Sequence, residues 1–144
     1  MNETAHTNVL ILETIVETAI YSYDLEGMEN FYSNVLNLPV IGKEVDRHVF
    51  LRVGPSSVLL IFKPETTLQG HQLPAHGTTG PGHLAFGVKS EVLDAWRACL
   101  VAYGTAIEME KTWPKGGRSI YFRDPAGNSV EIITPDVWGT PSGW

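Results

Sequence analysis

The sequence contains a single cysteine, Cys99, so no disulfide can form within the chain. Cys99 lies in a segment typical of a helix with one apolar face, and we interpret it as a structural residue. Basic residues are also scarce, because 10 Lys and Arg are outnumbered by 16 Asp and Glu and the net charge is −6. A chain with this charge has no basic stripe that could follow a phosphate backbone or an anionic membrane. Nucleic acid and membrane surfaces are therefore not expected partners.

The N-terminal stretch from Met1 to Glu13 lacks the marks of a targeting segment. Its charged residues, Glu3 and Glu13, are acidic, and no basic group precedes a long apolar run. We therefore predict neither a signal peptide nor a membrane anchor, and we expect a cytoplasmic protein.

Hydrophobic residues make up 43% of the 144 residues, which is enough to build the core of one domain without covalent cross-links. We therefore predict a single domain that spans residues 1–144. The patterning described next divides it into module one at about 15–64, a linker at 65–82, module two at 83–134 and a C-terminal tail at 135–144.

Module one has the pattern of a strand, a helix and three further strands. In residues 16–23 two sets of side chains alternate along the chain, as they do in a strand whose two faces lie in different environments. Asp24 is the expected N-cap of a helix, and apolar residues then recur at helical spacing as far as the turn at 37–39. Strands are predicted at 40–43, 48–53 and 57–63, which gives the order β-α-β-β-β.

The same pattern returns in module two, after a polar stretch rich in glycine and proline that we expect to be a linker or a mobile loop. A strand at 83–88 precedes a helix with Ser90 as its expected N-cap and Gly104 at its end. Strands follow near 106–111, 119–123 and 129–134. Each module exposes an apolar sheet face and edge strands that another copy must cover. The sequence leaves open whether that copy is the other module or a second subunit.

The internal repeat makes Glu17 and His83 equivalent, since each opens the first strand of its module. Glu131 lies in the last strand, between Val130 and Ile132, which by strand alternation point to the opposite face. A carboxylate in this apolar setting needs a partner, because an unpaired buried charge is costly. If the modules face each other across a pseudo-twofold axis, the three side chains converge on a candidate site for one divalent metal ion.

Each of these residues also has an ordinary structural interpretation. A single His such as His83 is often a satisfied core or surface residue, Glu131 also suits a paired structural carboxylate, and Glu17 also suits a solvated strand edge. All three occupy strand positions whose side chains point inward, which we call the inward parity, and this shared direction favours metal binding. Leu60 is the position of module one that matches Glu131, so three of four symmetric positions carry ligand-type side chains. The remaining coordination positions would be open, as they are in catalytic metal sites.

Several segments between Glu17 and Thr134 together resemble one known family. They are Glu17-Thr18-Ala19-Ile20 through Asp24-Leu25, Phe31-Tyr32 through Leu36-Asn37-Leu38, His83-Leu84-Ala85-Phe86, Tyr121 through Asn128, and Val130-Glu131-Ile132. The chain resembles the vicinal oxygen chelate superfamily, which includes glyoxalases, extradiol dioxygenases, fosfomycin-resistance proteins and bleomycin-binding proteins. The resemblance implies an α+β fold in which two β-α-β-β-β modules with cupped mixed sheets form an open barrel around a central site.

The resemblance also implies a chemistry. In that superfamily the metal ligands come from the first and last strands of the modules, which points to Glu17, His83 and Glu131. The implied mechanism is chelation of two substrate oxygens by the metal, which stabilises an enolate, oxyanion or alkoxide. Two carboxylates and one imidazole form a hard ligand set, so we expect one ion of Mn, Mg, Co, Ni or Fe(II) per site ahead of Zn. Two-module chains of this superfamily commonly pair with a second copy, which predicts a homodimer.

The sequence departs from the family pattern at specific positions. Glu17 stands where many members have His, which weakens the resemblance to extradiol dioxygenases, and Leu60 stands where glyoxalases usually carry a glutamate. The segment 117–122 resembles the anion-contacting segment of fosfomycin-resistance enzymes and places Ser119 and Tyr121 on the inward parity. The hydrolytic members of that group carry a general-base carboxylate early in the second strand, where this chain has Pro39-Val40.

Further residues are candidates for roles around the metal. His48 is the only general-base candidate outside the metal ligands, and Tyr121 is the second catalytic candidate. The expected substrate-binding residues are Tyr21, Phe50, Arg52, Lys111, Trp113, Arg118 and Ser119. The aromatic residues of this set could equally well be part of the hydrophobic core. The basic residues, and Lys115 near them, could equally well be solvated side chains of a loop. The tail carries Trp138 and Trp144, and we expect it to cover the site or a subunit interface.

Three functions follow from these observations. The first is a metal-dependent glyoxalase-family enzyme that acts on a small molecule with vicinal oxygens in a lyase, isomerase or transferase type of step. The second is a ring-cleaving dioxygenase, which predicts Fe(II) binding and oxygen uptake with catechols. The third is a non-catalytic, bleomycin-resistance-like binding protein, which predicts ligand affinity without metal.

Overall fold

Module one forms a four-stranded sheet with helices on one face. The structure is a computed structural model, and it describes residues 9–70 and 72–144. The elements of module one are β1 (Glu17–Tyr21), α1 (Leu25–Asn30), a π-helical turn (Phe31–Val35), β2 (Val40–Glu44), β3 (His48–Val53) and β4 (Ser57–Phe62). The strand order is β1-β4-β3-β2, in which β1 runs parallel to β4 and the other pairs are antiparallel.

Module two repeats this topology. Its elements are β5 (His83–Gly87), a 3₁₀ turn (Ser90–Val92), α3 (Leu93–Ala102), β6 (Met109–Thr112), β7 (Arg118–Arg123) and β8 (Ser129–Ile133). The strand order is β5-β8-β7-β6, again with the first and last strands parallel. The structure therefore confirms the predicted α+β fold of two β-α-β-β-β units with cupped mixed sheets that do not close into a barrel.

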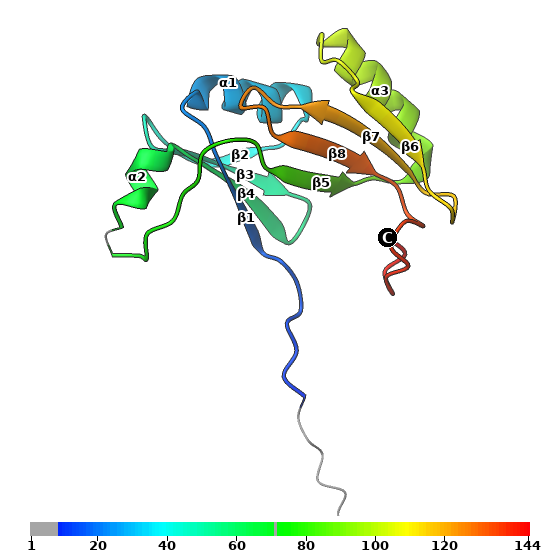
Figure 1. Ribbon diagram of the computed structural model, residues 1–144, viewed down its shortest axis with the longest axis horizontal. Helices are drawn as coiled ribbons and strands as arrows, with labels where there is room; N and C mark the ends of the chain where they lie inside the picture. The colour runs from blue at the N-terminus through cyan, green and yellow to red at the C-terminus, as the bar shows by residue number, and fades with distance from the viewer. Residues whose placement is uncertain (1–8, 71) are drawn as a thin grey trace, which may run out of the picture.

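One hydrophobic core serves both modules. Figure 1 shows α1 and α3 on the same side of the two sheets, while the N-terminal segment projects on the other side. Residues buried between the helices and the sheets come from both modules and include Met28, Tyr32, Leu51, Ile61, Leu100, Ile120, Phe122 and Ile132. We call the sheet faces turned away from these helices the open faces.

A buried hydrogen bond joins the two modules. The Tyr32 hydroxyl donates to Oδ2 of Asp124 at 2.7 Å, and both residues are buried. The other oxygen of Asp124 accepts from the backbone N–H groups of Ala126 and Asn128, which shapes the turn between β7 and β8. Burial and the neighbouring Asp124 carboxylate both raise the pKa of Tyr32, so its hydroxyl remains a donor.

We expect Tyr32→Phe to lower the free energy of unfolding by about 1–3 kcal/mol, because a buried carboxylate loses one of its donors. Urea denaturation followed by circular dichroism measures this change. Tyr103→Phe is the matched control, since Tyr103 is 58% exposed. Equal stability of the two variants would contradict the role given to the buried bond.

The predicted local signals were partly correct. Asp24 caps α1 as expected, and its Oδ1 accepts from the backbone N–H of Gly27 at 2.9 Å. Ser90 does not cap α3, because a 3₁₀ turn intervenes and the residue before α3 is Val92. The stretch expected to be a linker or mobile loop begins with a short helix, α2 (Pro64–Leu68), which has proline at its first turn, where no N–H is needed. In the part of the chain that is described, no helix combines the length and apolar character needed to cross a bilayer.

Candidate functional site

Strand alternation places the candidate ligands of module two on its open face. Val130 and Ile132 enter the core, so Glu131 between them points the other way. In the strand register Glu131 lies opposite Ala85 of β5 and Tyr121 of β7. The same face carries His83, Gly87, Lys111, Ser119 and Ile133. The predicted inward parity of Ser119, Tyr121 and Glu131 thus corresponds to one surface.

His83 and Glu131 form the centre of this surface. The Nε2 atom of His83 lies 3.3 Å from Oε1 of Glu131, and Nδ1 of His83 lies 2.9 Å from the backbone carbonyl of Ser129. A carbonyl only accepts hydrogen bonds, so Nδ1 carries the donated proton and Nε2 is directed at the carboxylate. Two lone-pair donors at this separation repel each other unless a proton or a cation lies between them. The pair therefore has the donor chemistry and the orientation of two metal ligands.

The second oxygen of the Glu131 carboxylate, Oε2, is held by hydrogen bonds from uncharged groups. Glu131 is 6% exposed, and its Oε2 accepts from the Ser119 hydroxyl at 2.5 Å. The indole N–H of Trp113 in turn donates to Ser119 Oγ at 2.8 Å. Within residues 9–70 and 72–144, no Lys or Arg forms an ion pair with this carboxylate. These hydrogen bonds orient the carboxylate without neutralising it, and Oε1 faces His83 across a space that a shared proton or a metal ion can occupy.

Tyr121 borders the pair on the neighbouring strand. Its ring stacks with that of His83 at a centroid distance of 6.4 Å and an interplanar angle of 24°. Burial raises the pKa of the Tyr121 hydroxyl, and the negative charge of Glu131 raises it further. The hydroxyl therefore stays protonated at neutral pH and can donate a hydrogen bond to a molecule beside His83.

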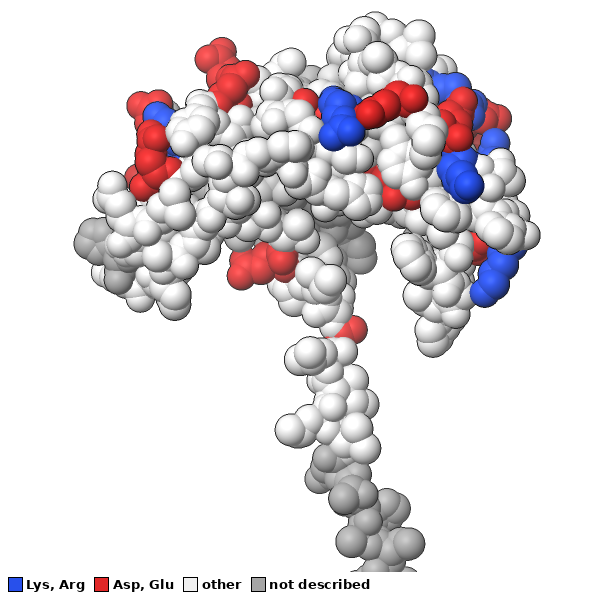
Figure 2. All heavy atoms as spheres, in the orientation of Figure 1, with Lys and Arg blue, Asp and Glu red and all other residues white. Residues whose placement is uncertain are grey.

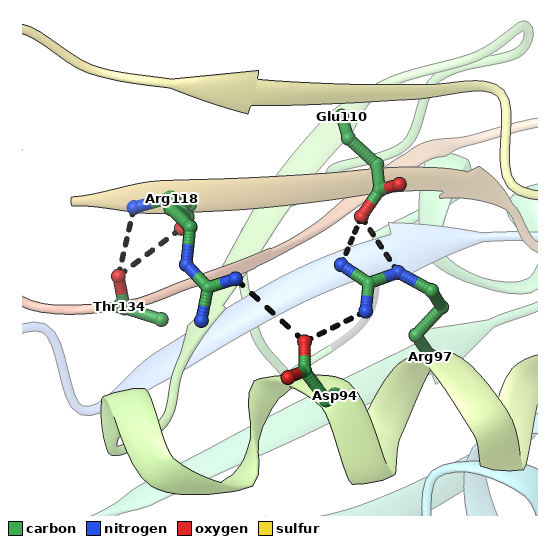
Figure 3. A network of polar contacts seen from close by, with 5 residues as sticks. All are labelled: Asp94, Arg97, Glu110, Arg118 and Thr134. Carbon is green, nitrogen blue, oxygen red and sulfur yellow. Dashed lines mark hydrogen bonds and ion pairs between the residues drawn. The ribbon is translucent and has the colours of Figure 1, made fainter. Parts of the chain in front are cut away.

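Of the basic candidates in module two, Lys111 faces the site and Arg118 does not. Lys111 is opposite Ser119 in the register, and its Nζ lies 5.4 Å from the centroid of the Trp113 ring. Arg118 points to the helix side, where its Nη1 lies 3.6 Å from Asp94 of α3. Figure 3 shows Arg118 directed at Asp94 together with Arg97, which also pairs with Glu110. Arg118 is thus a partner of α3 and does not lie beside Glu131.

Glu17 is separated from the other two candidate ligands within one chain. It is exposed at the start of β1, opposite Val58 of β4. Among the described residues, no three His, Cys, Asp or Glu side chains gather closely enough to hold a metal ion. The register also identifies the counterpart of Glu131 in module one. Leu60 pairs with Ala19 as Glu131 pairs with Ala85, so this position offers no oxygen donor.

The remaining candidates of module one form an aromatic cluster on its open face. His48 stacks on Phe50 at 4.0 Å with an interplanar angle of 5°, and both contact Phe62. Tyr21 stacks on Phe62 as well. Burial lowers the pKa of His48, and its nearest carboxylate, Glu44, is 3.9 Å away. His48 is therefore neutral at pH 7 and able to accept a proton. Arg52 is exposed on the same face of β3.

One member of this cluster was not predicted from the sequence. His76 lies in the chain between α2 and β5, and its Nδ1 is 2.6 Å from the Tyr21 hydroxyl. Its ring also packs edge-on against Phe62. The residue sits in a glycine- and proline-rich stretch without periodicity, so no local pattern indicated that it would return to β1. The candidate residues thus fall into two groups, one on the open face of each module.

Comparisons with known proteins give a consistent result. Residues 14–132 match the family model described as the Glyoxalase/Bleomycin resistance protein/Dioxygenase superfamily. The structure is similar to that of lactoylglutathione lyase from Agrobacterium tumefaciens, with a TM-score of 0.85 and 35% identity over 90% of this chain and 98% of that one. A search of curated proteins gave no match.

Two more distant structures share the fold. A glyoxalase/bleomycin resistance protein/dioxygenase from Nocardioides has a TM-score of 0.70 and 22% identity, covering 95% of this chain and 92% of that one. A genomically encoded fosfomycin resistance protein from Listeria monocytogenes has a TM-score of 0.66 and 21% identity, covering 92% and 98%. At these identities the likeness concerns the fold alone.

Proposed function

Because the chain belongs to the glyoxalase/bleomycin resistance protein/dioxygenase superfamily, we propose that it is a metal-dependent enzyme that binds two neighbouring oxygens of a small substrate. The observation that carries this proposal is the His83–Glu131 pair. A histidine with its second nitrogen fixed by a carbonyl converges at 3.3 Å with a buried carboxylate that has no Lys or Arg partner among the described residues. This arrangement suits a bound cation, because the two facing lone pairs are stabilised by one positive charge between them, which a proton supplies when no metal ion is bound.

Glu17 completes the proposed ligand set from a second copy of the chain. The repeat makes Glu17 the counterpart of His83, yet no three-residue ligand group forms among the described residues of one chain. A homodimer in which module one of one copy faces module two of the other would bring the two halves together. The enzyme would then hold two equivalent sites, and each site would need both chains.

The ligand set indicates the kind of ion. Two carboxylates and one imidazole suit Mn(II), Mg(II), Co(II), Ni(II) or Fe(II) better than a tetrahedral Zn(II). Such an ion supplies Lewis-acid stabilisation of negative charge that develops on a substrate oxygen. Leu60 adds no fourth protein ligand, so positions remain for two oxygens of a substrate.

Residues around the pair bind and orient the substrate in this proposal. Tyr121 donates a hydrogen bond from beside His83, and Lys111 contributes positive charge at the rim next to Trp113. The aromatic cluster of module one, brought by the second copy, excludes water from the opposite side. His48 within it is the proposed proton acceptor, since it is neutral at pH 7.

The reaction type we propose is a lyase, isomerase or transferase step. The experiment that tests it loads the protein with Mn(II), Co(II), Ni(II), Fe(II) or Mg(II) and counts the ions per chain by elemental analysis. Each loaded form is then assayed for formation of lactoylglutathione, the compound named in the Agrobacterium relative. Oxygen uptake with catechol would replace the proposal by a ring-cleaving reaction. A protein that binds none of these ions would overturn it.

We expect the hydrogen bonds to Glu131 to tune metal affinity. Ser119→Ala removes the donor at 2.5 Å from Oε2, and Trp113→Phe removes the N–H that orients the Ser119 hydroxyl. Loss of such supporting contacts typically weakens metal binding by about 10–100-fold, so we expect Ser119→Ala in that range and Trp113→Phe at its lower end. Isothermal titration with Mn(II) measures both. Tyr103→Phe, at a residue 58% exposed at the end of α3, is the control, and a Ser119→Ala affinity equal to the control would refute the assignment.

A further inference from the structure

The chain ahead of β1 carries an unusual number of exposed apolar side chains. Residues 9–16, which we call the N-terminal arm, extend away from the sheet as the blue segment that projects from β1 (Figure 1). The exposed apolar residues are Val9 at 77%, Leu10 at 96%, Ile11 at 74%, Leu12 at 99%, Ile15 at 76% and Val16 at 55%. Figure 2 shows the arm as a largely uncharged projection. Contiguous exposed apolar residues of this kind mark a contact surface for another molecule.

Little in the chain itself covers the arm. Within the described residues, its hydrogen bonds to the rest of the chain are at its end, where the carbonyl of Ile15 accepts from Ser57 Oγ at 3.2 Å and that of Val16 accepts from Val58 N–H at 2.8 Å. These bonds fix the direction in which the arm leaves β1. Ahead of them, adjacent residues such as Leu10 and Ile11 are exposed on both sides of the extended backbone. One sheet face could cover only half of them, so the surface that receives the arm is a groove or an edge that contacts both sides.

We propose that the N-terminal arm packs against module two of a second copy of this chain. The inference rests on the proposed shared site, and it follows from the covalent link between Val16 and Glu17. When Glu17 of one chain reaches His83 and Glu131 of another, the arm necessarily starts beside the same module. Eight extended residues span about 26 Å, which is long enough to cross a four-stranded sheet.

Module two offers apolar partners on that side of the molecule. Met109 lies on the open face opposite Tyr121 and is 52% exposed, and Trp138 in the tail is 75% exposed. The tail is held against the same sheet, where the Trp144 ring lies so close to Gly87 that an added Cβ would be 2.6 Å from it. Arm and tail thus each present exposed apolar side chains next to one half of the proposed site.

The area that the arm can bury is sufficient for a stable contact. Six aliphatic side chains bury roughly 100 Å² each when covered, so two symmetric arms remove on the order of 1,200 Å² from water, counting the arms alone. Specific protein interfaces begin at about this size. The arm alone therefore reaches the lower limit of a specific dimer, before the sheet edges are counted.

The test compares an arm variant with a matched surface control. Leu10→Ser/Leu12→Ser removes two fully exposed leucines, and Val45→Ser/Val101→Ser removes two valines that are 77% and 61% exposed elsewhere. Sedimentation equilibrium measures the dissociation constant of each homodimer. We expect the arm variant to raise it at least about a hundredfold and the control to leave it unchanged. Equal constants for the two variants, or a wild-type protein that is monomeric throughout, would overturn the inference.

Titration with Mn(II) separates this inference from the proposed function. Above its dissociation constant the arm variant should bind Mn(II) as the wild type does, because the arm contains none of the three ligands. If the wild type dimerises through the arm but binds no metal ion, the proposed function fails and the inference stands. If metal binds in a dimer that the arm variant does not weaken, the inference fails and the proposed function stands.

Discussion

Glu131→Ala should reduce Mn(II) affinity by at least about a hundredfold and leave no stoichiometric ion after dialysis. The variant loses the only carboxylate that lies against His83 among the described residues, and His83 with Glu17 of the second chain is a weaker site than the full set of three ligands. His83→Ala should have a comparable effect, because the buried carboxylate then lacks its neighbour. Elemental analysis of dialysed protein measures both losses.

The control for these variants is Glu110→Ala. Glu110 lies on the helix side of β6, where it pairs with Arg97, so its loss should leave the metal content unchanged. Thermal unfolding monitored by circular dichroism establishes that each variant remains folded. Retention of one ion per chain by folded Glu131→Ala would show that the ion binds elsewhere, and the His83–Glu131 pair would then have only a structural role.

A mixture of two inactive variants should regain metal sites if the site is shared between chains. Glu17→Ala and Glu131→Ala each lack one ligand in every site of their own homodimers. In a dimer of one chain of each kind, one site combines the intact Glu17 of one chain with the intact His83 and Glu131 of the other. Random exchange makes about half of the dimers mixed, so about a quarter of the wild-type Mn(II) sites should return.

The matched control mixes His83→Ala with Glu131→Ala. Both changes affect module two, so every mixed dimer has a damaged ligand pair in each site and no site returns. Equilibrium dialysis with Mn(II) quantifies both mixtures after the subunits have exchanged. If the first mixture binds no more ions than the second, while the wild type binds one per chain, all three ligands come from one chain.

The repeat and the strand parity could be predicted because they depend on local pattern. Alternation around Glu131 indicated that it faces away from Val130 and Ile132, and the structure has this arrangement. The same alternation, applied to Arg118 next to the inward Ser119, would have indicated that Arg118 faces the helices. The position of Arg118 in the strand therefore predicts its direction, whereas its positive charge alone does not indicate a place in the site.

Other features depend on contacts between distant segments, which local pattern does not encode. The approach of His76 to Tyr21 joins residues 55 positions apart through an irregular stretch. The hydrogen bonds from Trp113 to Ser119 and on to Glu131 depend on how β6 enters the sheet, and this strand starts at Met109, three residues later than predicted. The apolar character of the N-terminal arm was visible in the sequence, but its exposure became evident only with the fold.

The parallel pairing of the first and last strand in each module affects how the protein is made. During synthesis of module one, β1 cannot pair until the ribosome has also made β4, because the partner of Glu17 in the sheet is Val58. In the same way β5 cannot pair before β8 has been made. The hydrogen bond from Tyr32 to Asp124 can form only after 92 further residues have been added. Folding that depends on such long-range pairing is slow. A nascent chain therefore carries its apolar arm and an unfinished core for most of its synthesis, the period in which such surfaces are most prone to aggregate.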